Sequence, residues 1–359
     1  MPDKELTQTI RKGEELHEEN LKKFLLNNNL IKSEKNELVI RQFYNGYSNL
    51  TYLLKIEEKE YVLRRPPFAA PKRGHNMGRE FKVLSKLHNV FEKTPVTYAY
   101  TEDVKILGAP FYIMNKVEGI ILTAKEAKDR NVSPNDFKKI ADTWLDTFVE
   151  LHEVDYKAAG LESLGNPEGY VQRQVKNWGK QYLAAATEEV IAAHKVMSWM
   201  ENNQPRNYDY SLIHNDYKYD NVVFVNDQWE NILAVLDWEM CTLGDPMMDL
   251  GTSLGYWTTA TDADFLKQGL PSPTIMPGNP SRTEIVHEYA LKSGRDIKNL
   301  TYYFAYGLFK IAVIAQQIYY RFKHGYTKDP RFASLNKVSA LCCNTAWNAI
   351  QKDRIDELF

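Results

Sequence analysis

The residues best suited to chemistry are gathered in one segment, residues 211–250. His214 and Asp216 lie two residues apart, and Asn221 follows Asp216 by five residues. Asp237 comes sixteen residues after Asn221. Phosphoryl transfer needs a carboxylate that receives the proton of the attacking hydroxyl, and oxygen ligands that hold Mg²⁺ on the phosphates. We expect Asp216 to be the base, and Asn221 and Asp237 to be the metal ligands. We expect His214 to orient the loop through hydrogen bonds.

Three short apolar runs must position these side chains. Residues 211–213 precede the loop, residues 222–225 follow it, and residues 232–236 end directly before the second aspartate. The pattern predicts strand, loop, strand, turn and strand, with acids only where strands end. Asp245 and Asp249 follow, and this compound spacing argues against a solvated loop that carries polar residues by chance. A zinc site fits poorly, because one histidine among hard oxygen ligands suits Mg²⁺ rather than Zn²⁺.

The motifs HNDYKYDN, LDWE and GDPMMDLG resemble the catalytic loop, metal aspartate and following turn of the aminoglycoside-phosphotransferase-like small-molecule kinases. Within that family, the chain most resembles the kinase domain linked to acyl-CoA dehydrogenases in animals, and its free-standing bacterial relatives. The resemblance runs from about Arg41 to Ala349. It implies ATP and Mg²⁺ as cofactors and a small-molecule hydroxyl as acceptor. Lys218, two residues past Asp216, is a further candidate catalytic residue.

The region from residue 38 to residue 116 contains segments with the two-residue period of strands. Residues 38–43, 50–56 and 60–65 are expected to form three strands, and residues 96–100 and 111–116 to complete a five-stranded lobe. The turn between the first two strands offers backbone and side-chain donors that could cover phosphates. The candidate phosphate-binding residues in that turn are Gly46, Ser48 and Asn49.

Further nucleotide-binding residues are implied by the resemblance. Arg64 stands where the wider family has a lysine that contacts the α- and β-phosphates, and Glu80 would be its partner. Glu80 belongs to a predicted helix over residues 76–91, with a buried stripe formed by Phe81, Leu84, Leu87 and Val90 or Phe91. The family's hinge would place Met114 behind the adenine and the backbone of Asn115 and Val117 at its edge.

The remaining chain is expected to be mostly helical. Helices are predicted over residues 134–154, 170–185, 188–202 and 302–322. His152, at the end of the first of these, is expected to cap or pack rather than to bind a ligand. The predicted fold is α+β and protein-kinase-like. Residues 1–117 would form a small nucleotide-binding lobe with an antiparallel sheet, and residues 118–359 a larger, mainly helical lobe that carries catalysis and substrate binding.

Composition limits the classes of protein that fit. The chain has 359 residues and a net charge of −2, so no basic excess indicates nucleic-acid binding. The first twenty residues lack the apolar core of a signal peptide, and no run approaches the ~18 apolar residues of a membrane span. Cys241, Cys342 and Cys343 lack metal-binding spacing. We expect a soluble cytoplasmic protein.

Three functions fit these patterns: a small-molecule kinase, a protein kinase, and a nucleotide-binding module without activity. Asp-Trp-Glu in place of D-F-G argues against the second. The presence of every required acid argues against the third. For the first, the resemblance suggests a hydroxyacyl-CoA acceptor, whose phosphates Arg65, Lys72, Arg73 and Arg79 could bind while Trp257 and residues 268–281 cover the acyl chain. A polyhydroxyl antibiotic, whose amines are cationic, would instead favour an acid-rich acceptor pocket, and residues 268–281 contain no Asp or Glu.

Overall fold

The computed structural model describes residues 7–43, 49–67 and 76–359, which fall into two compact units. The first unit is Met1–Glu118 with Ala159–Leu161 and Ala234–Glu239. The second is Gly119–Ala158, Glu162–Leu233 and Met240–Phe359. Gly46, Ser48, Lys72 and Arg73, which the sequence nominates for phosphate binding, lie outside the described residues.

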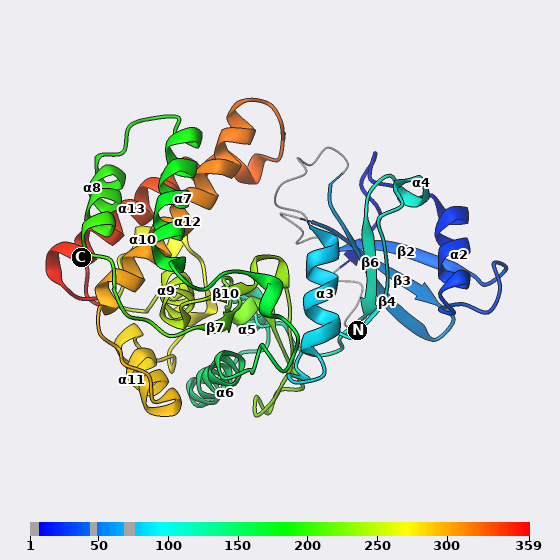
Figure 1. The fold of residues 1–359 in the computed structure, drawn as a ribbon, viewed down its shortest axis with the longest axis horizontal. Helices are drawn as coiled ribbons and strands as arrows, with labels where there is room; N and C mark the ends of the chain where they lie inside the picture. The colour runs from blue at the N-terminus through cyan, green and yellow to red at the C-terminus, as the bar shows by residue number, and fades with distance from the viewer. Residues whose placement is uncertain (1–6, 44–48, 68–75) are drawn as a thin grey trace. The chain divides into compact units, whose positions relative to one another are not determined.

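The first unit is built on an antiparallel sheet of six strands in the order β1-β2-β3-β4-β6-β5 (Figure 1). The strands predicted over 38–43 and 50–56 are present with those bounds. The expected count of five is wrong because β1 has two residues, too few to show an alternating pattern. The strands are β1 (Thr7–Gln8), β2 (Leu38–Phe43), β3 (Leu50–Ile56), β4 (Lys59–Arg65), β5 (Thr97–Thr101) and β6 (Phe111–Asn115).

Helices pack against both faces of this sheet. Helix α2 (Glu18–Asn27) contributes Leu21, Phe24 and Leu25 to a core that includes Leu63 and Phe111. Helix α3 (Met77–Leu87) packs against β5 and β6 on the opposite face. Because side chains alternate along a strand, Arg64 and Arg65, which end β4, must lie on opposite faces of the sheet. Within α3 and the turn after it, the predicted stripe is confirmed at Leu84, Leu87 and Phe91, whereas Phe81 is half-buried and Val90 exposed. The short helix α4 is Val104–Leu107.

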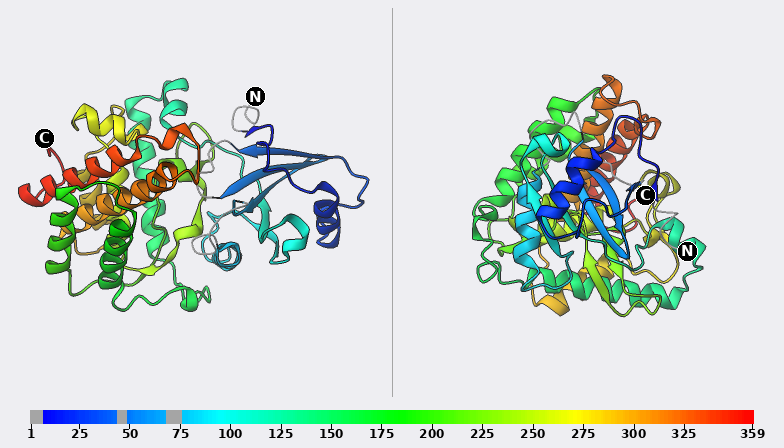
Figure 2. Two further views of the ribbon diagram at one scale, coloured as in Figure 1. Left: turned by 90° about the horizontal axis from the view of Figure 1, so that it is seen from above. Right: turned by 90° about the vertical axis from the view of Figure 1, so that its right-hand side faces the viewer.

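The second unit is mainly helical, with α12 through its middle. Helix α12 packs against α13 and α9, and Figure 2 shows α12 and α13 in orange and red. Among the described residues, no helix combines the length and apolarity that a membrane crossing demands. The helices are α5 (Ala124–Asp129), α6 (Pro134–His152), α7 (Tyr170–Ala185), α8 (Ile191–Asn202), α9 (Pro246–Tyr256), α10 (Asp264–Gly269), α11 (Arg282–Ser293), α12 (Leu300–Lys323) and α13 (Leu335–Lys352).

Helices α9 and α12 approach each other so closely that glycine is required at the contact. A Cβ on Gly307 would lie 1.9 Å from the carbonyl oxygen of Gly251, and a Cβ on Gly251 would lie 2.1 Å from that of Tyr303. No real Cβ tolerates such contacts, so the two backbones meet directly. This contact fixes the position of α12 along α9.

Short strands hold the segment with the candidate catalytic residues. Strand β7 (Ser211–Ile213) pairs antiparallel with β10 (Thr242–Gly244), and β8 (Val222–Phe224) pairs with β9 (Ile232–Val235). The predicted order of strand, loop, strand, turn and strand is therefore confirmed. Strand β10 was not predicted, because its three residues resemble the start of a turn. The predicted loop over 268–281 contains the end of α10 and a 3-10 turn, Pro273–Ile275.

Candidate active site

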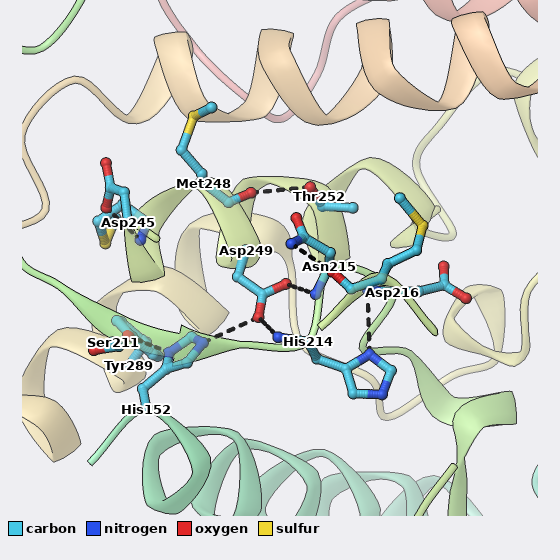
Figure 3. A network of polar contacts seen from close by, with 12 residues as sticks. His152, Ser211, His214, Asn215, Asp216, Asp245, Met248, Asp249, Thr252 and Tyr289 are labelled. Carbon is cyan, nitrogen blue, oxygen red and sulfur yellow. Dashed lines mark hydrogen bonds and ion pairs between the residues drawn. The ribbon is translucent and has the colours of Figure 1, made fainter. Parts of the chain in front are cut away.

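The backbone of the loop after β7 is hydrogen-bonded to Asp249, a buried residue of α9. The backbone N–H groups of His214 and Asn215 donate to the two carboxylate oxygens of Asp249, at 2.6 and 2.7 Å. Figure 3 shows this carboxylate between the loop backbone and His152. Asn215 has a φ of 69°, a left-handed conformation that costs a non-glycine residue roughly 1 kcal/mol. The bonds to Asp249 therefore stabilise a turn whose backbone conformation is unfavourable by itself.

A buried histidine completes this support. The Nε2 atom of His152 lies 3.2 Å from Asp249, and its Nδ1 lies 2.8 Å from the hydroxyl of Tyr289. Burial lowers the pKa of His152, although its hydrogen bond with Asp249 opposes the shift. Burial would raise the pKa of Asp249, but the hydrogen bond and charge of His152 turn the net shift downward. His152 packs inside the unit, as the sequence predicts, and its partner Asp249 was not predicted.

Asp216 sits at the end of the supported turn, with its side chain 18% exposed. Its backbone N–H donates to Nδ1 of His214 at 3.2 Å. Its Oδ2 atom accepts a hydrogen bond of 2.7 Å from the Asn221 amide and lies 3.3 Å from Nζ of Lys218. The structure thus brings together the four residues that the sequence nominates in this loop. A carboxylate fixed in this way and still open to solvent is able to accept a proton.

The amide of Asn221 has a defined orientation. Its Nδ2 donates to both the carbonyl oxygen and Oδ2 of Asp216, at 2.8 and 2.7 Å. Within the side-chain amide only the nitrogen is a donor, so Nδ2 faces Asp216 and Oδ1 must point away from it. That oxygen accepts no hydrogen bond from the residues the structure describes. Its direction and chemistry suit a hard cation such as Mg²⁺.

Lys218 lies among acids and an aromatic ring. Its ammonium is 3.3 Å from Asp216 and 4.0 Å from Asp220, and it stands 4.7 Å from the centre of the Tyr256 ring. The cation–π contact and the two carboxylates keep this positive charge beside the candidate base.

In the first unit, Arg64 is the centre of a cluster of acids. Its Nη1 donates to Glu80 at 2.7 Å, while Nη2 contacts Asp237 and lies 3.5 Å from Glu239. Burial lowers the pKa of Arg64, but Asp237 and Glu80 more than offset this and raise it well above its ordinary value. Burial raises the pKa of Glu80, against the opposing charge of Arg64. The expected pairing of Arg64 with Glu80 is present, and Arg64 also reaches the proposed metal ligand Asp237.

Asp237 is presented by a strained turn directly after β9. It has a φ of 67°, and the indole of the next residue, Trp238, donates to Val235 at 2.8 Å. Glu239 follows and accepts a bond of 2.7 Å from the amide of Asn49. The sequence nominates Asn49 for phosphate binding but gives Glu239 no role. The position of Glu239 two residues after Asp237 is the signal that could have identified it.

One expectation for the first unit is corrected by the hydrogen bonds. Arg65 is fully buried and donates to the carbonyl oxygens of Leu107 and Pro66, at 2.7 and 3.1 Å. It therefore faces away from Arg64 and cannot meet a CoA phosphate. At the predicted hinge, the backbone N–H of Asn115 donates to the carbonyl oxygen of Val96 at 2.9 Å. Met114 is buried and Val117 is half-buried.

The antiparallel-sheet unit, the mainly helical unit and the loop that carries Asp216 and Asn221 define a protein-kinase-like α+β fold. A model of the phosphotransferase enzyme family matches residues 39–274. The chain belongs to the phosphotransferase enzyme family. A crystal structure of a candidate aminoglycoside phosphotransferase from Ralstonia eutropha is 30% identical, with a TM-score of 0.77. The match covers 94% of this chain and 99% of that protein.

Curated relatives are longer proteins. Acyl-CoA dehydrogenase family member 10 of Mus musculus is 30% identical over 350 residues, which cover 97% of this chain and 32% of that protein. Acyl-CoA dehydrogenase family member 11 of Homo sapiens is 34% identical over 293 residues, 80% of this chain and 37% of that protein. The chain thus spans about a third of the length of the curated relatives it matches.

Proposed function

We propose that the chain transfers the γ-phosphoryl group of ATP to a hydroxyl of a small molecule, with Asp216 as the base. The observation that carries this proposal is the environment of the Asp216 carboxylate. It is held by Asn221 at 2.7 Å and flanked by Lys218, at the end of a turn fixed by Asp249. A base fixed in this way can orient the attacking hydroxyl and accept its proton. His214, whose Nδ1 accepts the N–H of Asp216, would orient the loop.

We propose that Mg²⁺ is held by Asn221 and Asp237 together with the phosphates of the nucleotide. The residues that the structure describes contain no group of three or more His, Cys, Asp or Glu side chains suited to a metal. This fits Mg²⁺, which is usually bound by one or two protein ligands plus substrate phosphates rather than by an all-protein cage. The ion would neutralise the charge that develops on the phosphates during transfer.

Arg64 is the proposed phosphate-binding cation of the first unit. Its guanidinium is held by Glu80 and contacts Asp237, so its orientation is fixed. An arginine binds phosphate oxygens through two parallel N–H groups, a geometry that lysine does not have. Asn49, with Gly46 and Ser48, would contribute further donors, and Met114 and Val117 would line the adenine site.

The proposed acceptor is the hydroxyl of an acyl-CoA thioester. Support comes from the relatives, which carry acyl-CoA dehydrogenase names although this chain matches only about a third of them. Lys218 supports the same choice, because an ammonium 3.3 Å from the base disfavours a cationic acceptor. The absence of Asp and Glu from residues 268–281 points the same way. Arg79 is the one CoA-phosphate candidate among the described residues that remains after the correction of Arg65.

An aminoglycoside is the second candidate acceptor, because a candidate aminoglycoside phosphotransferase shares 30% identity over nearly the whole chain. The two candidates differ in charge. An aminoglycoside carries several ammonium groups, whereas CoA carries phosphates, so the two make opposite demands on Lys218.

Release of ADP with four acceptors, assayed side by side, tests the proposal. The acceptors are a 4-hydroxyacyl-CoA, its free acid, choline and an aminoglycoside, each with ATP and Mg²⁺. Turnover with the thioester is expected, and phosphate should appear on its hydroxyl. Turnover confined to choline or the aminoglycoside would refute the acyl-CoA acceptor while leaving phosphoryl transfer intact.

A further inference from the structure

Helix α12 buries a lysine in an apolar environment. Lys310 is 1% exposed, and its neighbours Phe309 and Ile311 are buried apolar residues. Taking an ammonium out of water is costly unless hydrogen bonds or opposite charges compensate for it. The proposed chemistry does not assign this residue any role. The role of its buried charge must be inferred from the groups that it contacts.

Both hydrogen bonds of Lys310 go to the residue before the proposed base. Its Nζ donates to the backbone oxygen of Asn215 at 2.7 Å and to Oδ1 of the same residue at 3.0 Å. The side-chain nitrogen of Asn215, Nδ2, donates to the carbonyl oxygen of Met240 at 3.1 Å. The side chain and carbonyl of Asn215 are thus fixed from α12, while its N–H is fixed from α9 by Asp249.

The peptide group between Asn215 and Asp216 is held at both of its polar ends. Its carbonyl oxygen accepts from Lys310, and its N–H donates to Nδ1 of His214 at 3.2 Å. A peptide group is planar, so fixing both ends fixes the plane. The orientation of that plane sets the direction in which the next residue projects its side chain. That next side chain is the carboxylate of Asp216.

The position of Lys310 follows from the contact between α9 and α12. Gly307, three residues before Lys310, has its Cα against the backbone of Gly251. Gly251 is two residues from Asp249 along α9. One helix contact therefore places an anion and a cation beside the same turn. Asp249 accepts from the N–H of Asn215, and Lys310 donates to the carbonyl oxygen of that residue.

Combining these contacts, we propose that Lys310 is a positioning residue for phosphoryl transfer, which sets the direction of the Asp216 carboxylate through the peptide group of Asn215. The inference rests on the proposed function, because it assumes that Asp216 is the base. Lys310 does not touch the reacting atoms. Its loss should lower turnover while leaving nucleotide binding nearly intact.

Charge supports the assignment. Burial lowers the pKa of Lys310 to about 8, against the opposing charges of Asp249 and Asp216. At pH 7 the ammonium form therefore predominates, and the hydrogen bonds to Asn215 are charge-assisted. The indole ring of Trp178, with its centre 5.9 Å from Nζ, lies on another side of the same ammonium. Assays at pH 7 test the charged form.

The experiment compares Lys310→Met with Gln316→Met at pH 7. Gln316 is also buried on α12 and donates to a backbone carbonyl, that of Ala185 at 2.9 Å, but it does not contact the catalytic loop. Lys310→Met should lower kcat by about 10- to 100-fold, with KM for ATP within about threefold of wild type. Gln316→Met should lose stability but keep kcat, and Lys310→Arg should recover part of the lost turnover. Equal kcat values in Lys310→Met and Gln316→Met would overturn the inference and leave the proposed function standing.

Hydrogen exchange tests the same inference without an acceptor. Relative to the rest of the chain, amide exchange in residues 211–221 should become faster in Lys310→Met and stay unchanged in Gln316→Met, because only the first variant releases the peptide group of Asn215. Unchanged exchange in Lys310→Met would overturn the positioning role. A wild-type protein that turns over no hydroxyl acceptor would instead refute the proposed function, on which the inference rests.

Discussion

Two aspartates at the start of α9 are both fully buried, yet their pKa values are shifted in opposite directions. Burial raises the pKa of Asp245 from its ordinary value of 3.8 to about 7, more than its hydrogen bond from Met247 lowers it. The pKa of Asp249 is lowered, because His152 and the other charges around it outweigh burial. Replacing each with asparagine should therefore change the free energy of unfolding in different ways.

The substitution Asp245→Asn removes a carboxylate that the folded protein prefers to keep protonated. The folded state holds this proton up to about pH 7, whereas the unfolded chain releases it near pH 3.8. Between these values the unfolded state binds fewer protons, so wild-type stability falls as pH rises and is flat above about pH 7. At 1.36 kcal/mol per pKa unit, the full shift corresponds to about 4 kcal/mol. Between pH 5 and pH 8 the stability of Asp245→Asn relative to wild type should rise by roughly 2–3 kcal/mol.

The assay is denaturant unfolding of both proteins at pH 5, 6, 7 and 8 at one temperature. The difference between the two proteins isolates residue 245, because asparagine also caps a helix N-terminus through its side-chain oxygen. The matched control is Asp249→Asn, which should lose about 3–5 kcal/mol through its broken buried hydrogen bonds. That loss should be the same at pH 7 and pH 8, since Asp249 is ionised there and the lowered pKa of His152 keeps its imidazole neutral in both folded proteins. A difference between Asp245→Asn and wild type that does not change with pH would refute this reasoning.

Further predictions concern the first unit. Asp237→Ala should abolish activity and the Mg²⁺-dependent tightening of ATP binding; an unchanged Mg²⁺ effect in an ATP titration would remove Asp237 from the metal site. Arg64→Ala should weaken ATP binding by at least about tenfold, the effect of losing charge-assisted hydrogen bonds. Arg65→Ala should instead cost roughly 2–4 kcal/mol of stability, because it leaves the Leu107 carbonyl without its donor, and should bind ATP as wild type does. Equal losses of ATP affinity in the two arginine variants would contradict the opposite orientation of these side chains.

Much of the fold could be predicted because the longer elements carry clear periodicity. Residues 50–56 alternate between the faces of a sheet, and residues 170–185 repeat at the helical period, so both elements have the predicted bounds. Strand β1 has two residues, too few for a period to appear, and the three residues of β10 lack the apolar run that marks β7 and β8. They depend on pairing with strands that are distant in the sequence, β10 with β7 and β1 with β2.

The candidate catalytic loop could be predicted from spacing, but its supports could not. Asp216, Asn221 and Lys218 lie within six residues, so the motif itself brings them together. Asp249 and Lys310 contact the loop from 34 and 95 residues away along the chain. On α12, Lys310 stands inside a helical pattern whose apolar residues indicate core, and nothing in that pattern shows which carbonyl the lysine meets. Only the approach of α9 and α12 at their glycines gives that information.

The most direct test of phosphoryl transfer by Asp216 is single-turnover formation of phosphorylated acceptor by Asp216→Asn and wild type, with ATP affinity measured on the same samples. Asparagine has the shape of aspartate but cannot accept the proton of the attacking hydroxyl. The account predicts that Asp216→Asn binds Mg²⁺ and ATP with wild-type affinity and forms product at least about 10²-fold more slowly. Product formation at the wild-type rate would contradict the account, since Asp216 would then not be the base.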